Sequence, residues 1–233
     1  MVKSIAIVGG SSDIAKSTIS SMSADAYKFH VLVRDDSHTQ ELSALGVNVV
    51  LGDATSEEDI KNFISGVKES AEIHAVLHCV GSFAVRPPHA MNKEAFETVI
   101  STNLTSAFLT LSIAGKAMLS QGHGRMVFMS SVAGSLGLVN HEAISAAKGG
   151  IESMVRSAAA TYANRGLRIN AVAPGLTDTK LASPIMSNET ASQAASQKIP
   201  IKRVGQKEEV ANVIKWLLTE APENFTGQIL HTD

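Results

Sequence analysis

The chain has 233 residues, 44% of them hydrophobic and 18% charged, which is the composition of a folded globular protein and excludes a disordered chain. Its 22 acidic and 20 basic residues nearly balance and no run of Lys or Arg is present, so neither a nucleic-acid-binding stripe nor a membrane-attracting patch is indicated. We therefore expect one domain over residues 1–233 that acts on a small-molecule substrate.

The cysteine content and the N-terminal segment bear on the compartment. Cys79 is the only cysteine, so no intramolecular disulfide can form and a reducing compartment is expected. The first apolar stretch, residues 5–8, runs directly into Gly9 and is too short for a signal-peptide core or a membrane span. Both observations favour a cytoplasmic protein with no membrane partner.

Short apolar runs bounded by turn residues alternate with longer segments of helical period. The runs predict seven strands, at residues 4–8, 29–33, 48–51, 75–80, 125–129, 168–172 and 228–231. Several runs are apolar at consecutive positions, which is typical of strands whose two faces are both covered by helices. The predicted fold is therefore α/β, a doubly wound parallel sheet of seven strands with helices on both faces.

Three helices and one loop stand out between the strands. A helix is expected over residues 56–70, where Thr55 and Glu58 have the spacing of a capping box. Two longer helices are expected over residues 93–119 and 142–163. Residues 177–195 are mainly polar and predict a mobile loop with short helices over a site.

A turn rich in glycine and serine follows the first strand and opens a helix. Backbone amides at a helix N-terminus bind phosphate, and glycine lets the pyrophosphate of a dinucleotide approach closely. A tight turn before a serine-capped helix, with no ligand, is the alternative. The turn consists of Gly9, Gly10, Ser11, Ser12, Asp13, Ile14 and Ala15.

Arg34 follows the second predicted strand, where a carboxylate would bind the ribose of NAD. A guanidinium at this place would instead bind the 2′-phosphate of NADP, so NADP(H) is the expected cofactor. Asp35 and Asp36 come next, and a shift of one residue in the strand end would favour NAD(H). A solvated charged turn is a third interpretation.

Further short motifs follow in a fixed order along the predicted elements. Asp53 and Ala54 follow the third strand, His78, Cys79, Val80 and Gly81 the fourth, Asn103 lies in Asn-Leu-Thr, Met129, Ser130 and Ser131 end the fifth, and Pro174, Gly175, Thr177 and Thr179 follow the sixth. Together with the first turn, these motifs resemble those of the short-chain dehydrogenase/reductase family over nearly the whole chain. The resemblance implies a Rossmann-type fold.

The resemblance also implies the roles of individual residues. Ser131, Lys148 and Asn103 match the family's catalytic serine, lysine and asparagine. Asp13 and Ala15 stand where the family has glycines, which narrows the space for phosphate. The implied cofactor-binding residues are Gly9, Ser11, Ser12, Asp13, Ile14, Arg34, Asp53, Ala54, Val80, Gly81, Lys148, Pro174, Gly175, Thr177 and Thr179.

The largest departure from the family is Ile144. In the family a tyrosine lies thirteen residues after the serine and four before the lysine, and it protonates the carbonyl oxygen that accepts the hydride. Ile144 has that spacing from Ser131 and Lys148. Isoleucine cannot supply a proton, so the resemblance implies an oxidoreductase for a small carbonyl or conjugated substrate whose proton relay is atypical or impaired.

Three explanations of Ile144 stay open. His141, one turn earlier, could supply the proton, although a surface histidine is the simpler interpretation. Substrate or water could supply it, with Lys148 acting directly or through water. The chain could instead bind NADP without catalysis, as a regulatory or sensing homologue, and a deliberately introduced change of tyrosine to isoleucine would give the same pattern. Tyr162 lies too far along the helix to replace the phenol.

Other features bear on metals, assembly and substrate. His74 and His78 are expected on the same side of a strand, too far apart to share a metal, so no metal site is proposed.

Alanine-rich faces of the two long helices suit pairing into a homodimer or homotetramer, and the alternative is that they cover the sheet. Loops 82–90 and 177–195 are expected to build the substrate pocket, with Phe83, Ile185 and Met186 as an apolar wall.

Overall fold

The computed structural model describes residues 2–187 and 189–233. Seven parallel strands form one sheet in the order β3-β2-β1-β4-β5-β6-β9, which confirms the predicted doubly wound Rossmann-type fold. The strands are β1 (Lys3–Val8), β2 (Tyr27–Val33), β3 (Asn48–Leu51), β4 (Ile73–His78), β5 (Gly124–Met129), β6 (Leu167–Pro174) and β9 (Ile229–Thr232). Two short strands, β7 (Thr177–Asp178) and β8 (Gly205–Gln206), pair with each other outside this sheet.

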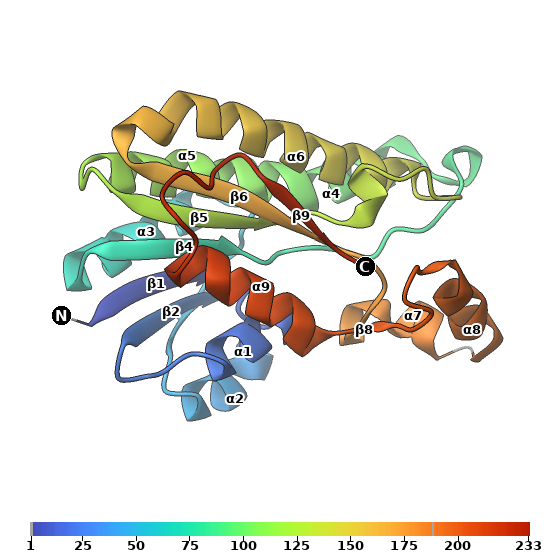
Figure 1. Cartoon of the computed structure of the whole chain (residues 1–233), viewed down its shortest axis with the longest axis horizontal. Coiled ribbons are helices and arrows are strands. Elements are labelled where there is room, and N and C mark those ends of the chain that lie inside the picture. The colour runs from blue at the N-terminus through green and yellow to red at the C-terminus, as the bar shows by residue number, and fades with distance from the viewer. Residues whose placement is uncertain (1, 188) are drawn as a thin grey trace.

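Helices cover both faces of the sheet, as Figure 1 shows. One face packs against α1 (Asp13–Ser20), α2 (Thr39–Ala44) and α9 (Lys207–Thr219), and the other against α3 (Glu57–Ser70), α5 (Ser106–Leu119) and α6 (Glu142–Tyr162). The remaining helices are α4 (Lys93–Ile100), α7 (Ser183–Met186) and α8 (Glu189–Lys198), with short 3-10 helices at Asp36–His38, Pro88–Ala90, Val132–Gly134, Ala163–Arg165 and Lys180–Ala182.

Strand β1 shows why the apolar runs are continuous. Ile5 and Ile7 belong to the cluster under α1 and α9, whereas Ala6 and Val8 belong to the cluster under α3, α5 and α6. All four are fully buried. Because successive side chains of a strand point to opposite faces, a strand between two helical layers must be apolar at every position.

The helix expected over residues 93–119 is interrupted in its middle. A π-helical turn, Ser101–Thr105, separates α4 from α5, and the Ser106 hydroxyl donates to the carbonyl of Thr102 at 2.6 Å. The extra residue in this turn brings Asn103 into the interior, where it is fully buried. The span 93–119 is long and apolar enough to cross a membrane, but Ala107, Leu111 and Met118 are buried against the sheet, as in a core helix.

Two local predictions were wrong. The N-cap of α3 is Ser56, whose hydroxyl accepts from the amide of Asp59, and not Thr55. His74 and His78 lie on opposite faces of β4, because the strand has a bulge next to Ile73. His74 packs against Tyr27 on the α9 side, whereas His78 packs against Phe128 on the α5 side.

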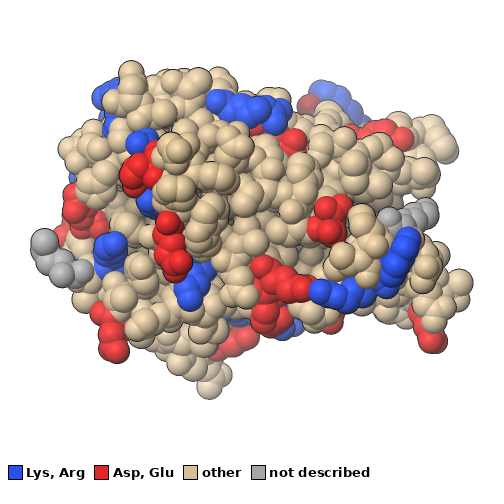
Figure 2. All heavy atoms as spheres, in the orientation of Figure 1, with Lys and Arg blue, Asp and Glu red and all other residues tan. Residues whose placement is uncertain are grey.

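The small residues of the long helices mainly cover the sheet. Ala107, Ala114, Ala158 and Ala159 are buried within this chain, as expected if these helix faces cover the sheet. On the outer side, Phe108 of α5 is 56% exposed. On the face shown in Figure 2, basic and acidic side chains are intermixed and neither sign forms a continuous patch.

Candidate nucleotide-binding and catalytic site

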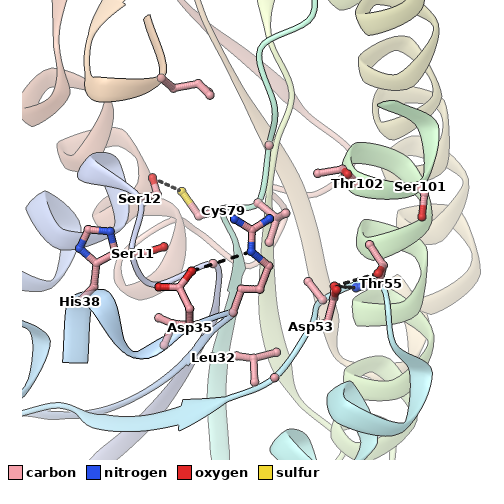
Figure 3. Close-up of a pocket in the computed structure, with 18 of the residues that line it drawn as sticks. Ser11, Ser12, Leu32, Asp35, His38, Asp53, Thr55, Cys79, Ser101 and Thr102 are labelled. Atoms are coloured by element: carbon pink, nitrogen blue, oxygen red, sulfur yellow. Dashed lines mark hydrogen bonds and ion pairs between the residues drawn. The ribbon is translucent and has the colours of Figure 1, made fainter. Parts of the chain in front are cut away.

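A cavity of about 760 Å³ opens at the carboxyl ends of β1, β2 and β4. In a doubly wound sheet this is the place where the strand order reverses and where ligands bind. Figure 3 shows its two walls, with Ser11, Asp35 and His38 on one side and Ser101 and Thr102 on the other. The predicted residues that line it are Gly9, Ser11, Ser12, Asp13, Ile14, Arg34, Asp53, Ala54, Val80, Gly81 and Thr179.

The turn after β1 requires glycine at its first position. Gly9 has a φ of +87°, and a Cβ there would lie 2.8 Å from Val80 and 2.9 Å from the backbone of Cys79. Ser12 is the N-cap of α1, and its hydroxyl accepts from the amide of Ala15. The same hydroxyl lies 3.2 Å from the Cys79 thiol, so the turn is held directly against the end of β4.

Arg34 is the first residue after β2, as the sequence predicts. Its side chain is 81% exposed, and Nε lies 3.9 Å from the Asp35 carboxylate. Asp35 accepts hydrogen bonds from the amide and hydroxyl of Ser37, which lower the pKa of this carboxyl. Arg34, Asp35 and His38 all line the cavity, so a guanidinium, a carboxylate and an imidazole meet at its outer end.

Asp53 and Ala54 follow β3 and line the same cavity. One oxygen of Asp53 accepts from the amide of Thr55 at 2.7 Å and from its hydroxyl at 2.8 Å. These two hydrogen bonds lower the pKa of Asp53, so its carboxylate is charged at neutral pH. The position of Asp53 fits a contact with a base or ribose at this end of the cavity.

Lys148 and Asn103 meet in front of Gly81. Lys148 is buried on α6 and donates to the carbonyl of Met129 at 2.9 Å. Asn103 donates to the carbonyl of Val99 at 2.9 Å and to the Ser82 hydroxyl at 2.8 Å. A Cβ at Gly81 would lie 3.5 Å from the Asn103 amide oxygen and 3.7 Å from the Lys148 ammonium. Glycine therefore leaves open the space that these two polar groups face.

Burial changes the protonation of the groups around β4. It lowers the pKa of Lys148 to about 8. It also lowers the pKa of the fully buried His78 to about 3, with the Lys148 charge adding to the effect. The His78 ring nitrogen Nε2 lies 3.0 Å from the Ser106 hydroxyl. Near neutral pH the site thus contains a neutral imidazole and an ammonium that releases its proton more readily than an exposed lysine.

Ser131 and the loop after β6 lie at the carboxyl ends of β5 and β6, outside the cavity lining. The Ser131 hydroxyl donates to the carbonyl of Pro174 at 3.4 Å and accepts from the amide of Ala133. Gly175 donates to the carbonyl of Thr232, and the buried Thr177 donates to the carbonyl of Gly175. Among the residues predicted to bind cofactor, Pro174, Gly175, Thr177 and Lys148 are not part of the cavity lining.

Ile144 lies one helical turn before Lys148 and is 7% exposed. Its neighbours are apolar, with Val99, Ala133, Ala143 and Ala147 in the same cluster and Met91 and Leu104 packed against it. His141 precedes α6, and its Nδ1 lies 2.7 Å from the carbonyl of Val139. Tyr162 ends α6, about 27 Å along the helix from Ile144 at ~1.5 Å per residue, and packs against the cluster under α5.

Several lining residues were not predicted from the sequence. Lys180 and Leu181 lie in the segment 177–195 that was predicted to cover the site, but neither was named individually, and His38 comes from the short helix after β2. The wall formed by α4 and the π turn adds Glu94, Glu97, Thr98, Ser101 and Thr102. Asn103 was the one available signal for this wall, because the turn that buries it also exposes its neighbours to the cavity.

Comparison with known proteins agrees with this geometry. A family model described as Enoyl-(Acyl carrier protein) reductase matches residues 9–233. The 3-oxoacyl-[acyl-carrier-protein] reductase MabA of Mycobacterium bovis is 31% identical over 231 residues, which cover 99% of this chain and 91% of that protein. Cis-4-hydroxycyclohexanecarboxylate dehydrogenase of Sinomonas cyclohexanicum is 35% identical over 185 residues, 78% of this chain and 73% of that protein.

Solved structures show the same fold. A short-chain type dehydrogenase/reductase from Mycobacterium ulcerans matches with a TM-score of 0.92 at 26% identity, over 99% of this chain and 88% of that one. The structure of ElxO with NADP bound matches with a TM-score of 0.92 at 25% identity, over 99% and 97% of the two chains. The fold and the cavity are those of a dinucleotide-binding protein. This chain belongs to the short-chain dehydrogenase/reductase family, whose members are NAD(P)-dependent oxidoreductases.

Proposed function

We propose that this protein is an NADP(H)-dependent oxidoreductase for a small carbonyl or conjugated substrate, with an impaired proton relay because Ile144 occupies the position of the family tyrosine. One observation supports both parts of the proposal. The buried Lys148 and Asn103 face an open space at Gly81, and the residue one turn before Lys148 is an isoleucine surrounded by apolar side chains.

The residues present fit a dinucleotide cofactor. The cavity of about 760 Å³ has the glycine turn and the N-terminus of α1 at one side and the open space at Gly81 at the other. In this proposal the turn residues Gly9, Ser11, Ser12, Asp13 and Ile14 hold the pyrophosphate through backbone amides and hydroxyls, Asp53 and Ala54 contact the adenosine part, and Val80, Gly81 and Thr179 contact the nicotinamide half. Lys148, whose ammonium faces Gly81, contacts the same half. The role is extended to Pro174, Gly175 and Thr177, which lie outside the cavity lining, because they match the family motif. When bound, NADPH supplies a hydride.

Arg34 supports NADP(H) over NAD(H). Its guanidinium is exposed at the mouth of the cavity, whereas the Asp35 carboxylate is engaged by Ser37. A 2′-phosphate would gain charge-assisted hydrogen bonds from Arg34, and His38 lies in the same part of the lining. The two structures of ElxO, described with NADP and with NADPH bound, support the same choice.

Three side chains retain roles in this proposal. Ser131 polarises the substrate carbonyl when its hydroxyl turns to the substrate from the carbonyl of Pro174, to which it donates at 3.4 Å. Lys148 holds the nicotinamide ribose and keeps its ammonium beside Gly81 below a pH of about 8. Asn103, bonded to Val99 and Ser82, fixes the π turn and orders water next to the lysine. The names of the relatives, among them a 3-oxoacyl reductase and a levodione reductase, support a carbonyl as the reacting group.

Loss of a positioned general acid costs about 10²- to 10⁴-fold in rate. With no phenol at residue 144, we propose that the proton comes from water or substrate, with Lys148 acting directly or through water. His141 is a second source, but its Nδ1 is engaged by the carbonyl of Val139, so only Nε2 is free to act. Activated carbonyls, quinones and conjugated alkenes need the least help from an acid and are the preferred substrates.

A second function is supported by the same apolar surroundings of Ile144. In this alternative the protein binds NADP(H) without redox turnover and serves as a regulatory or sensing homologue. The test is a titration with NADPH and NADH, followed by NADPH oxidation with ketones, diketones, quinones and enones. Binding with turnover supports the oxidoreductase, and binding without turnover supports the sensor. Tighter binding of NADH than of NADPH would contradict the cofactor assignment.

We further propose that residues 1–233 act as one dinucleotide-binding domain in the cytoplasm, and that the chain forms a homodimer or homotetramer. The assembly is supported by Phe96 and Phe108, which are 41% and 56% exposed on α4 and α5. Exposed aromatic side chains on the outer surface of a helix are typical of an interface.

A further inference from the structure

The segment after β7 begins with a 3-10 helix, Lys180–Ala182, which we call the lid helix. Its N-cap residue, Thr179, has an extended backbone but makes no capping hydrogen bond, because its hydroxyl donates to the carbonyl of Thr177. The first amide of a helix has no partner within the helix and must find one elsewhere. In the lid helix that amide belongs to Lys180.

The partner of this amide comes from a part of the chain that is distant in sequence. The Lys180 N–H donates to the Asp13 carboxylate at 2.7 Å, across 167 residues of sequence. Asp13 is the first residue of α1, next to the Ser12 cap in the glycine turn. A carboxylate of the nucleotide-binding turn therefore caps the lid helix.

The Asp13 side chain is well placed to keep this contact. It is 13% exposed, and its other oxygen lies 3.5 Å from the Lys16 ammonium. Burial raises the pKa of Asp13. The hydrogen bond from the Lys180 amide and the charge of Lys16 together lower it by more, so the pKa of Asp13 lies below its usual value. The carboxylate is thus charged across the physiological pH range and accepts hydrogen bonds throughout it.

The contact also separates two cavities. Asp13 and Lys180 both line the nucleotide cavity, and both line a second cavity of about 560 Å³ between α1 and α9. Leu181, the next residue of the lid helix, lines the nucleotide cavity but not the second cavity. The hydrogen bond is therefore a part of the cavity wall.

We propose that Asp13 is a positioning residue that fixes the lid helix against the nucleotide-binding turn, so that this wall of the cavity is formed before a nucleotide binds. Without the cap, the nucleotide must order the lid helix when it binds, which lowers the affinity. The carboxylate has an opposing effect, because it repels a pyrophosphate at the N-terminus of α1. An uncharged hydrogen-bond acceptor at residue 13 keeps the lid helix ordered and removes the repulsion of the pyrophosphate.

The first experiment compares Asp13→Ala with Asp13→Asn by amide hydrogen exchange without nucleotide. Loss of a helix cap costs about 1 kcal/mol, so the amide of Ala182, which donates to the carbonyl of Thr179 at 3.0 Å, is expected to exchange roughly fivefold faster in Asp13→Ala. Asp13→Asn keeps an acceptor oxygen and is expected to restore the slower exchange. Glu41→Gln is the matched control, because Glu41 also binds Lys16, at 3.0 Å, and among the described residues makes no hydrogen bond to the backbone of the lid helix.

The second experiment removes the donor instead of the acceptor. Lys180→Pro deletes the amide hydrogen at the first helical position, where proline is well tolerated after the extended Thr179. Lys180→Ala removes the same side chain and keeps the amide. Faster exchange at Ala182 is expected for Lys180→Pro and not for Lys180→Ala, with no further increase when Asp13→Ala is added.

Titration with NADP+ gives an independent readout. Among the uncharged variants, Asp13→Asn is expected to bind about fivefold more tightly than Asp13→Ala, because only the former keeps the cap. Equal exchange and equal affinity in the two variants would overturn the proposal. If none of the proteins binds NADP+, the proposed cofactor fails, whereas the exchange comparison still decides whether Asp13 holds the lid helix.

Discussion

Ile144 and Lys148 lie one turn apart on the same side of α6, and both are buried, one among apolar side chains and the other beside Gly81 and Asn103. The ammonium of Lys148 donates to the carbonyl of Met129, so it stays ordered without a phenol next to it. The helix thus presents a buried, ordered lysine and, one turn earlier, a side chain that cannot transfer a proton.

The burial of Lys148 predicts a specific dependence of stability on pH. Its pKa in the folded protein is about 8, below the ordinary value of 10.5. Between these values the unfolded chain holds a proton that the folded chain has released, so the free energy of unfolding rises as the pH increases from about 8 to 10.5. The rise due to this group is at most roughly 3 kcal/mol.

Urea unfolding of the native protein and of Lys148→Met, at several pH values and without nucleotide, measures this effect. The difference in free energy of unfolding between the two proteins should grow in favour of the native protein over that window. A difference that stays constant with pH would show that the lysine titrates normally.

Arg34 is expected to determine the choice between NADPH and NADH. Arg34→Gln removes a charge-assisted contact with the 2′-phosphate, which is worth about 1.5–3 kcal/mol, or roughly 10- to 150-fold in affinity for NADPH. Affinity for NADH should not change. Because the side chain is 81% exposed, the free energy of unfolding should not change either. If the affinity for NADPH did not change, Arg34 would not select the cofactor, and another residue of the lining, such as His38, would have to do so.

Gly81 is expected to be required for nucleotide binding and not for folding. A Cβ there has ordinary contact distances, 3.5 Å to Asn103 and 3.7 Å to Lys148, so Gly81→Ala should fold. The methyl group fills the space in front of the ammonium, and affinity for NADPH should fall about tenfold, a loss of ~1.4 kcal/mol. Gly66→Ala on α3 is the control, because its Cβ meets nothing within 4 Å and should leave binding unchanged. If Gly81→Ala and Gly66→Ala bound NADPH equally well, the nicotinamide half would not lie next to Gly81.

Phe108 is expected to take part in self-association. Phe108→Glu puts a charge on the outer surface of α5 and should shift the protein toward monomer in light scattering at micromolar concentration. The native protein should scatter as a dimer or tetramer. Leu51→Glu, at a side chain of similar exposure, 59%, at the end of β3, should not change the mass. A native monomer would exclude the assembly.

The sequence predicts the sheet well, because strands buried on both faces are apolar at every position. The strand at residues 48–51 has the predicted bounds, and the end of β2 at Val33 fixes the position of Arg34. Residues next to strand ends, such as Gly9 and Gly81, could be assigned to the cavity for the same reason, since parallel strands place their carboxyl ends at one edge.

Features that depend on the third dimension were not predictable in this way. The spacing of Ile100, Leu104 and Phe108 fits a continuous α-helix, so this spacing does not reveal the π turn that buries Asn103. The bulge in β4 reverses the side of His74 without a change in pattern. The bond between Asp13 and Lys180 joins residues 167 apart and follows only from the folded arrangement.

The central claim is that a formed nucleotide site lacks its proton donor at residue 144. NADPH oxidation by the native protein and by Ile144→Tyr, with the same ketones, diketones, quinones and enones, tests it most directly. We expect equal affinity for NADPH and a rate about 10²- to 10⁴-fold higher for Ile144→Tyr, with the smallest gain for the most activated substrates. Native turnover that equals or exceeds that of Ile144→Tyr on simple ketones would contradict the claim.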